Sequence, residues 1–377
     1  MVLTGDGGTP SRIDGVPELV VIAEQLLAPV PGGTGRYTAE LLRALATTAP
    51  EGWHVSSVVA RRADVEAARI EGVRGPRRLP LPPRALVLAW QAGLPARAGG
   101  WPGGDAVHAP TPLAPPRAPT GRSLSVTVHD TVPWTHPATL TPRGVRWHRS
   151  AIARAAREAD ALVVPTAAVA ADLGGRVAVR ADVHVVGHGT TSALAEPAER
   201  PELPERYVLA IGTLEPRKGI DVLIEAMREV ADVPLLLVGQ QGWGGLDPRA
   251  LAVEHGVDPA RVRMLGRLPD RKLAAVLHGA SVLAVPSLAE GFGLPLLEGM
   301  AAGVPVVHSD APALVEVAGG AGITVPRGDA PALARAICTV LGDPEAARRM
   351  SARGERRATA FSWRAAAQQV WTIHAGP

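Results

Sequence analysis

The sequence predicts an α/β protein with two doubly wound parallel sheets, and three observations support this fold class. The chain has 377 residues, which is too long for one ordinary hydrophobic core. Short apolar runs rich in β-formers alternate with helical stretches along most of its length, as in parallel sheets. A segment rich in Pro and Glu at residues 197–205 divides these units into two groups and is predicted to be a linker.

The composition indicates a globular protein and excludes several kinds of site. Hydrophobic residues make up 46% of the chain and charged residues 20%, unlike disordered segments. The formal net charge is +3, so no nucleic-acid partner is expected. The single cysteine, Cys338, excludes an internal disulfide and a cysteine-based zinc site. Its apolar surroundings predict a buried thiol.

The N-terminal segment shows no pattern of a leader or a membrane anchor. Residues 1–18 are polar and rich in glycine and proline, which predicts a flexible tail without a basic region. The apolar stretch 19–30 is interrupted by Glu24 and Gln25, and no run reaches the roughly 18 apolar residues of a membrane span. We therefore expect a cytoplasmic protein.

The first half of the chain contains a series of short β-forming runs separated mostly by helical stretches. The crowded Pro, Gly and Arg residues of 72–119 predict irregular loops with one short helix near 84–93. The predicted strands are Leu19–Ala23, His54–Ala60, Asp105–His108, Leu124–Val128, Ala161–Val164 and Val183–Val186.

A glycine-rich turn follows the first predicted strand and precedes a predicted helix at Thr38–Thr48. Gly32, Gly33 and Gly35 lie in this turn, and glycines there let backbone N–H groups approach a phosphate or a sugar closely. The spacing is not that of the dinucleotide-binding fingerprint. An ordinary turn between two elements is the alternative interpretation.

His129 and Asp130 directly follow the predicted strand 124–128. Ligands of open α/β sheets bind outside the carboxyl ends of the strands, so His129 is a candidate site residue; a structural histidine is the alternative. Asp130 is predicted either to orient an acceptor hydroxyl or to cap the next turn.

The segment 141–160 is a predicted helix that carries many arginines at helical spacing. A solvated basic face is one interpretation, and contact with anionic lipid headgroups is the other. These arginines are Arg143, Arg146, Arg149, Arg154 and Arg157.

The second half repeats the alternation after the linker. Its predicted strands are 206–211, 234–239, 262–265, 281–285 and 303–307, and its predicted helices are 220–230, 248–255, 312–318, 331–341, 344–359 and 362–374. Arg217 and Lys218 lie in the loop after its first strand. A guanidinium and an ammonium in that position are suited to two phosphates, whereas a solvated basic pair is the ordinary alternative.

The stretch Pro286–Glu298 follows a buried strand and is the centre of the prediction. Gly291 and Gly293 free a loop, and Pro295 suits the first turn of a helix. The unpaired N–H groups of such a helix attract anions. Glu290 on the loop and Glu298 inside the helix are predicted to accept hydrogen bonds from the hydroxyl groups of a sugar and a ribose.

These motifs resemble those of the retaining family-4 glycosyltransferases. The stretch 290–298 resembles the E-x7-E signature with its Glu-Gly-Phe-Gly, residues 212–219 resemble the Gly-x-x-x-x-Arg-Lys-Gly motif, and residues 32–37 resemble the Gly-Gly-x-Gly-Arg-Tyr loop. The resemblance implies the GT-B fold, in which two doubly wound domains face each other across a nucleotide-sugar cleft. It implies an acceptor-side domain at 19–195, a donor-binding domain at 196–360 and a helix at 361–377 that crosses back.

The resemblance also implies a role for each matching residue. Glu290, His129, Arg217 and Lys218 are expected at the reacting centre, with Arg217 and Lys218 neutralising the departing diphosphate. The expected acceptor side is Gly32, Tyr37 and Asp130. The remaining expected donor contacts are Gly33, Gly35, Arg267, Leu268, Phe292, Gly293, Leu294 and Glu298.

The implied activity is transfer of a sugar from a nucleotide diphosphate sugar to a hydroxyl acceptor with retention of configuration. The spelling Gly-Thr-Leu-Glu-Pro-Arg-Lys-Gly is most similar to mannosyltransferase-like members, which implies GDP-mannose as donor. The chain lacks a clustered Asp-x-Asp, so no metal and no cofactor are expected. A nucleotide-sugar 2-epimerase and a non-catalytic scaffold of the same fold are the alternatives, and peripheral contact with the inner membrane surface stays open.

Overall fold

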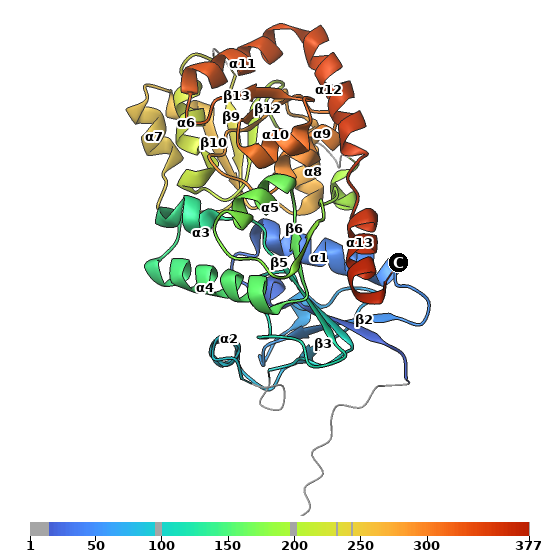
Figure 1. Ribbon diagram of the computed structural model, residues 1–377. Coiled ribbons are helices and arrows are strands. Elements are labelled where there is room, and N and C mark those ends of the chain that lie inside the picture. Colours follow the sequence, from blue (N-terminus) through green and yellow to red (C-terminus); the bar gives the residue numbers. More distant parts are fainter. Residues whose placement is uncertain (1–14, 95–99, 197–201, 231–232, 243, 377) are drawn as a thin grey trace, which may run out of the picture.

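The computed structural model describes residues 15–94, 100–196, 202–230, 233–242 and 244–376. Two α/β units lie one above the other, and the last helix of the chain returns from the upper unit to the lower one (Figure 1). Each unit has one parallel sheet, which confirms the predicted fold class.

The first sheet has seven parallel strands in the order β3-β2-β1-β4-β5-β6-β7. Six of them lie within one or two residues of the predictions. Strand β3 was not predicted, because its Arg-Gly-Pro-Arg-Arg sequence has no apolar pattern and the strand lies at the sheet edge. The strands are β1 (Glu18–Ile22), β2 (His54–Val59), β3 (Arg74–Arg78), β4 (Ala106–Ala109), β5 (Ser123–Thr127), β6 (Ala161–Val164) and β7 (Asp182–Val185).

The helices of the first unit are α1 (Gly32–Thr47), α2 (Pro83–Gln91), α3 (Val132–Thr135), α4 (Pro142–Glu158) and α5 (Ala167–Gly174). The predicted start of α1 at Thr38 is wrong, because the helix already begins at Gly32 and the Gly35 N–H donates to the Pro31 carbonyl at 2.9 Å. The glycine-rich segment is therefore the first turn of a helix. The predicted tail at 1–18 is too long by one residue, since Glu18 begins β1; residues 1–14 lie outside the described ranges.

The second sheet has six parallel strands in the order β10-β9-β8-β11-β12-β13. These strands are β8 (Val208–Ile211), β9 (Leu235–Val238), β10 (Val262–Gly266), β11 (Val282–Val285), β12 (Val306–Ser309) and β13 (Ile323–Val325). The surrounding helices are α6 (Ile220–Ala226), α7 (Pro248–Glu254), α8 (Asp270–His278), α9 (Leu294–Ala301), α10 (Pro312–Ala318), α11 (Ala330–Gly342) and α12 (Pro344–Ala358). Helix α8 and strand β13 were not predicted from the sequence.

The strand order reverses between β1 and β4 in one sheet and between β8 and β11 in the other. Ligands of doubly wound sheets bind outside the carboxyl ends of the strands at such reversals. The segments that follow β1, β4, β8 and β11 therefore contain positions from which a site can be built, and the segment after β5 lies next to the one after β4.

Helix α13 (Trp363–Ala375) packs on α1 of the first unit, which agrees with the predicted crossing helix (Figure 1). Trp363 and Trp371 are both buried in the core that also contains Leu41. Trp371 Nε1 donates to the Leu45 carbonyl at 3.2 Å. The predicted core role of the two tryptophans is confirmed.

The structure also bears on the predictions for Cys338, the linker and a membrane span. Cys338 is exposed, so the predicted buried thiol is wrong: it lies on the solvent face of amphipathic α11, beside Arg335 and Thr339. Residues 197–201 of the predicted linker lie outside the described ranges. Within those ranges, no helix is long and apolar enough to cross a membrane.

Candidate active site

The loop between β11 and α9 forms the centre of the candidate site. It ends at Gly293, which precedes α9 with a φ of +93°. A Cβ at Gly293 would lie 2.4 Å from Leu314 Cδ2, so this position requires glycine for both its backbone and its space. No side chain caps α9, and its first N–H groups are therefore available to an anion.

This loop also touches the other unit of the fold. A Cβ at Gly291 would lie 1.7 Å from the His129 carbonyl oxygen, and Thr166 Oγ1 donates to the Gly291 carbonyl at 3.0 Å. Glycine is required because the two backbones are in contact here. The contact brings the predicted residues Glu290, His129 and Asp130 to one place.

The loop after β8 brings Arg217 and Lys218 to the same place. Gly219 has a φ of +65°, and a Cβ there would lie 2.3 Å from the Pro286 carbonyl oxygen. The Leu288 N–H donates to the Arg217 carbonyl at 2.8 Å. Arg217 Nη1 donates to the Ala289 carbonyl at 2.8 Å. The two loops are thus held side by side by backbone contacts.

Arg217, Lys218 and Glu290 form one charged cluster. Lys218 Nζ lies 2.6 Å from Glu290 Oε1, and Arg217 Nη1 lies 3.6 Å from Glu290 Oε2. Ser287 Oγ also donates to Glu290 Oε1 at 2.8 Å, and Arg217 pairs with Glu215 at 3.1 Å. Burial raises the pKa of the Glu290 carboxyl, but Lys218 and Arg217 outweigh this effect and keep the pKa below its usual value. Glu290 is therefore a carboxylate that accepts hydrogen bonds and holds both cations in place.

Glu298 lies on α9 and is buried, with 3% of its side chain exposed. Arg36, from the first turns of α1 in the other unit, lies 3.0 Å from Glu298 Oε1 and 2.9 Å from Asp270. Thr191 Oγ1 donates to the same carboxylate at 3.5 Å. Burial raises the pKa of Glu298, although Arg36 opposes the shift. One guanidinium thus links the two units through two carboxylates.

His129 is partly buried and has one ring nitrogen committed to the backbone. Its Nε2 lies 2.8 Å from the Pro110 carbonyl oxygen, which only accepts hydrogen bonds, so Nε2 carries the proton. Burial lowers the pKa of His129, so the ring is neutral and its Nδ1 is an acceptor. Asp130 accepts from the Val132 N–H at 3.0 Å, which confirms the turn-capping interpretation.

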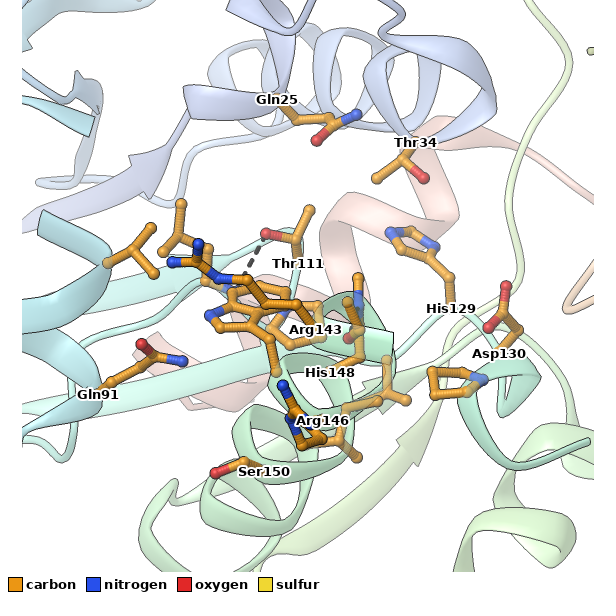
Figure 2. A pocket seen from close by; sticks show the side chains of 18 of the residues that line it. Gln25, Thr34, Gln91, Thr111, His129, Asp130, Arg143, Arg146, His148 and Ser150 are labelled. Carbon is orange, nitrogen blue, oxygen red and sulfur yellow. Dashed lines mark hydrogen bonds between the residues drawn. The ribbon is translucent and has the colours of Figure 1, made fainter. Parts of the chain in front are cut away.

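A cavity of about 790 Å³ opens beside His129 and Asp130. Figure 2 shows His129 and Asp130 at one side of it and Arg143 and Arg146, from α4, farther along its wall. The described residues that line it belong to the first unit, and they also include Glu24, Gln25, Thr34, Val87, Gln91, Thr111, Trp147, His148 and Ser150. The volume lies in the usual range for small-molecule sites.

Of the three glycines predicted to lie close to a ligand, only Gly33 lies near the start of α9. A Cβ at Gly33 would be 3.9 Å from Leu294 Cδ1, and Gly32 faces open space. Gly35 is buried in α1, where a Cβ would lie 2.4 Å from Pro31 Cβ. The absent side chain of Gly35 allows the first turn to pack, and the donor contacts of Gly33 and Gly35 remain predictions.

The predicted acceptor contact of Tyr37 is wrong. Its side chain is 1% exposed and belongs to the core. Its hydroxyl lies 3.1 Å from Thr127 Oγ1, and its ring packs edge-on against His129 at 4.7 Å. Tyr37 therefore packs against His129 from the core side.

The remaining predicted donor residues lie in the second unit. Arg267 is exposed after β10, and Leu268 packs partly against the second core. Phe292 is buried and lies 4.4 Å from the ring of His188. The base contacts of Arg267 and Leu268 remain predictions.

Several residues of the site were not predicted from the sequence. Arg36 belongs to the glycine-rich motif at residues 32–37, but its local sequence does not indicate that its side chain reaches Glu298. His188 is buried between Tyr37, Phe292 and Trp363, and burial lowers its pKa well below the usual value. The glycines on either side of it, Gly187 and Gly189, could have indicated from the sequence that other side chains pack closely against His188.

The arginines of α4 do not form one basic face. Arg149 donates to the Pro133 carbonyl at 2.9 Å, and Arg154 donates to the Trp90 carbonyl at 2.6 Å. Arg143 and Arg146 instead line the cavity, whereas Arg157 is exposed. A group of three or more metal-binding side chains does not occur in the described part of the chain; metal independence remains a prediction.

Two family models match the chain. Residues 31–193 match the model described as Glycosyltransferase Family 4, and residues 205–343 match the one described as Glycosyl transferases group 1. The chain belongs to the family-4 glycosyltransferases.

Relatives of this family-4 chain include two mannosyltransferases. The O-antigen chain mannosyltransferase B of Escherichia coli is 39% identical over 162 residues, which cover 42% of this chain and 42% of that protein. The MMP alpha-(1->4)-mannosyltransferase of Mycolicibacterium hassiacum is 32% identical over 276 residues, which cover 68% of this chain and 66% of that protein. The alignments thus span less than two thirds of either relative's length.

A solved structure shares the whole architecture. The sucrose-phosphate synthase of Thermosynechococcus elongatus superposes with a TM-score of 0.75 at 25% identity, covering 95% of this chain and 98% of that one. The predicted GT-B fold is confirmed.

Proposed function

We propose that this family-4 chain is a retaining glycosyltransferase that moves a sugar from a nucleotide diphosphate sugar to a hydroxyl acceptor. The observation that supports this most is the cluster of Arg217, Lys218 and Glu290 held against His129 where the two units touch. Two cations and an uncapped helix start suit a diphosphate. The adjoining cavity suits a second substrate.

The donor lies along the C-terminal crevice in this proposal. Arg217, Lys218 and the N–H groups of Gly293 and Leu294 hold the diphosphate, and Glu298 accepts hydrogen bonds from the ribose. Glu290 gives up part of its contact with Lys218 and accepts from the sugar hydroxyls. His129 Nδ1 accepts from one further sugar hydroxyl, because its Nε2 is already bonded to Pro110.

The reaction forms one glycosidic C–O bond and breaks the bond between the anomeric carbon and the diphosphate oxygen. The acceptor proton passes to the departing diphosphate on the face that it leaves. Lys218 and Arg217 stabilise the negative charge that grows on the diphosphate. In this route no carboxylate attacks the sugar, and Asp130 keeps its hydrogen bond to the Val132 N–H.

The first donor to test is GDP-mannose. The Glu-Pro before Arg217 suggests this donor, and two relatives are named mannosyltransferases. Arg267 is exposed at the end of β10 and can stack on the base.

Release of nucleoside diphosphate from GDP-mannose, UDP-glucose and a dTDP-sugar, without acceptor, tests the proposal. We expect slow release of nucleoside diphosphate, and we expect it to be fastest from GDP-mannose. Faster release from UDP-glucose or the dTDP-sugar would reject the mannose assignment. Absence of release from every donor would favour a non-catalytic scaffold. Conversion of a donor to its 2-epimer would favour an epimerase, although the cavity beside His129 argues for a separate acceptor.

A further inference from the structure

Arg143 and Arg146 lie on the wall of the acceptor-side cavity without a partner of their own. Among the described residues, neither guanidinium has a hydrogen bond or an ion pair, whereas Arg149 and Arg154 on the same helix both donate to backbone carbonyls. The two groups of arginines therefore differ in what they do. Arg149 and Arg154 hold the fold, and Arg143 and Arg146 face the space in which a substrate is proposed to lie (Figure 2).

The acidic residues of the cavity do not neutralise these two charges. Glu24 pairs with Arg62 and accepts from the Ala60 N–H at 2.9 Å. Asp130 accepts from the Val132 N–H and lies at the other side of the cavity (Figure 2). The cavity therefore has a positive wall away from the reacting centre.

The start of α4 adds to this positive wall. Thr141 and Gly144 both line the cavity, and α4 runs for 17 residues from Pro142. Its amino end carries a partial positive charge. A second hollow of about 510 Å³ shares Val87 and Arg143 with the first and adds Arg84. Arg84 likewise has no hydrogen bond or ion pair within the described ranges.

We infer that the acceptor carries a phosphate group that Arg143 and Arg146 bind, while its reacting hydroxyl lies at His129 and Asp130. This inference rests on the proposed transferase function and specifies its acceptor class. The phosphate takes no part in bond formation; it fixes the orientation of the acceptor. Arginine suits this role because its planar guanidinium binds two phosphate oxygens at once.

Direct binding tests the inference without knowledge of the acceptor. The probe is inorganic phosphate, titrated calorimetrically in the presence of saturating nucleoside diphosphate so that the donor-side anion site is filled. We expect Arg143→Ala/Arg146→Ala to weaken phosphate binding by about ten- to hundredfold. The matched control is Arg157→Ala, an exposed arginine of the same helix away from the cavity, which should bind phosphate as the wild type does. Equal affinity in the wild type and the double variant would overturn the inference.

Transfer assays test it a second time and separate it from the proposed function. Neutral polyols and sugars are compared with their phosphate esters, and the soluble esters are compared with vesicles containing phosphatidylinositol, whose headgroup joins a polyol to a phosphate. We expect the phosphorylated member of a pair to have the higher kcat/KM, and the vesicle arm shows whether a soluble ester or a lipid headgroup supplies the phosphate. The double variant should raise KM for that acceptor and leave nucleoside diphosphate affinity unchanged.

Each contrary result has one meaning. Equal use of neutral and phosphorylated acceptors would reject the phosphate inference and leave the transferase proposal standing. Weakened nucleoside diphosphate binding in the double variant would assign the arginines to the donor and also reject the inference. Absence of any transfer or donor turnover in the wild type would reject both proposals.

Discussion

Arg36→Ala removes the guanidinium that links α1 to Glu298 and Asp270. The attraction between Arg36 and Glu298 at 3.0 Å is roughly 5.5 kcal/mol at an effective dielectric constant of about 20. Water recovers part of this, since 24% of the Arg36 side chain is exposed. Loss of one partner from a buried pair usually costs about 3–5 kcal/mol, and we expect the lower end of that range. The Asp270 contact adds about 0.5 kcal/mol or less, because 48% of that side chain is exposed.

The pH dependence of this loss identifies its cause. Burial raises the pKa of Glu298 in the folded protein, and removal of Arg36 raises it further. A carboxyl whose folded pKa exceeds its unfolded pKa destabilises the fold progressively as pH rises through the folded value. The deficit of Arg36→Ala should therefore be full near neutral pH and should shrink toward the unfolded pKa of about 4.3.

Urea unfolding followed by tryptophan fluorescence measures the free energy of unfolding at several pH values. The matched control is Arg43→Ala on the same helix, whose ion pair with Glu40 is half exposed; it should cost about 0.5 kcal/mol or less. Adding Glu298→Gln to Arg36→Ala should restore most of the lost stability, since no buried charge remains. A deficit that is independent of pH and unrelieved by Glu298→Gln would refute this reasoning.

Three further predictions concern catalysis. Lys218→Ala should lower kcat by about two to three powers of ten. The control is Lys272→Ala, which changes the only other lysine of the chain, an exposed one, and should leave kcat unchanged. Equal kcat values in the two variants would exclude Lys218 from the site. Because Lys218 and Arg217 hold the pKa of Glu290 below its usual value, loss of activity through its protonation should occur at lower pH than for an ordinary glutamate. Lys218→Ala should move this acid limb to higher pH. A limb that stays in place would show that Glu290 does not control it. Activity should persist in excess chelator, and a strict requirement for magnesium or manganese would contradict the assignment of charge neutralisation to Arg217 and Lys218.

The fold was largely predictable because buried parallel strands such as 161–164 and 282–285 leave continuous apolar runs in the sequence. The exceptions are elements whose own residues carry no clear signal. Strand β3 is an edge strand of charged residues, so its place is set by pairing with β2 and not by its own hydrophobicity. Helix α1 begins at Gly32, although a segment with three glycines in four residues has low intrinsic helix propensity.

The candidate site was predictable where one local motif supplies both position and chemistry. Arg217, Lys218, Glu290 and Glu298 all lie in strand-to-helix loops or first turns at the carboxyl ends of strands, so topology alone places them at one crevice. The pairing of Arg36 with Glu298 joins positions 262 residues apart and depends on how the two units face each other. Tyr37 was misassigned for the same reason, since its neighbours His129, His188 and Trp363 come from three distant segments.

A crystal structure with bound nucleoside diphosphate tests the central claim most directly. The account predicts that the phosphates lie within hydrogen-bond distance of Lys218 Nζ, Arg217 and the N–H groups of Gly293 and Leu294, with the ribose hydroxyls on Glu298. It also predicts that Lys218 Nζ moves away from Glu290 Oε1, from which it is 2.6 Å distant without a nucleotide. A nucleotide bound instead against Arg143 and Arg146, with the Lys218–Glu290 pair unchanged, would contradict it.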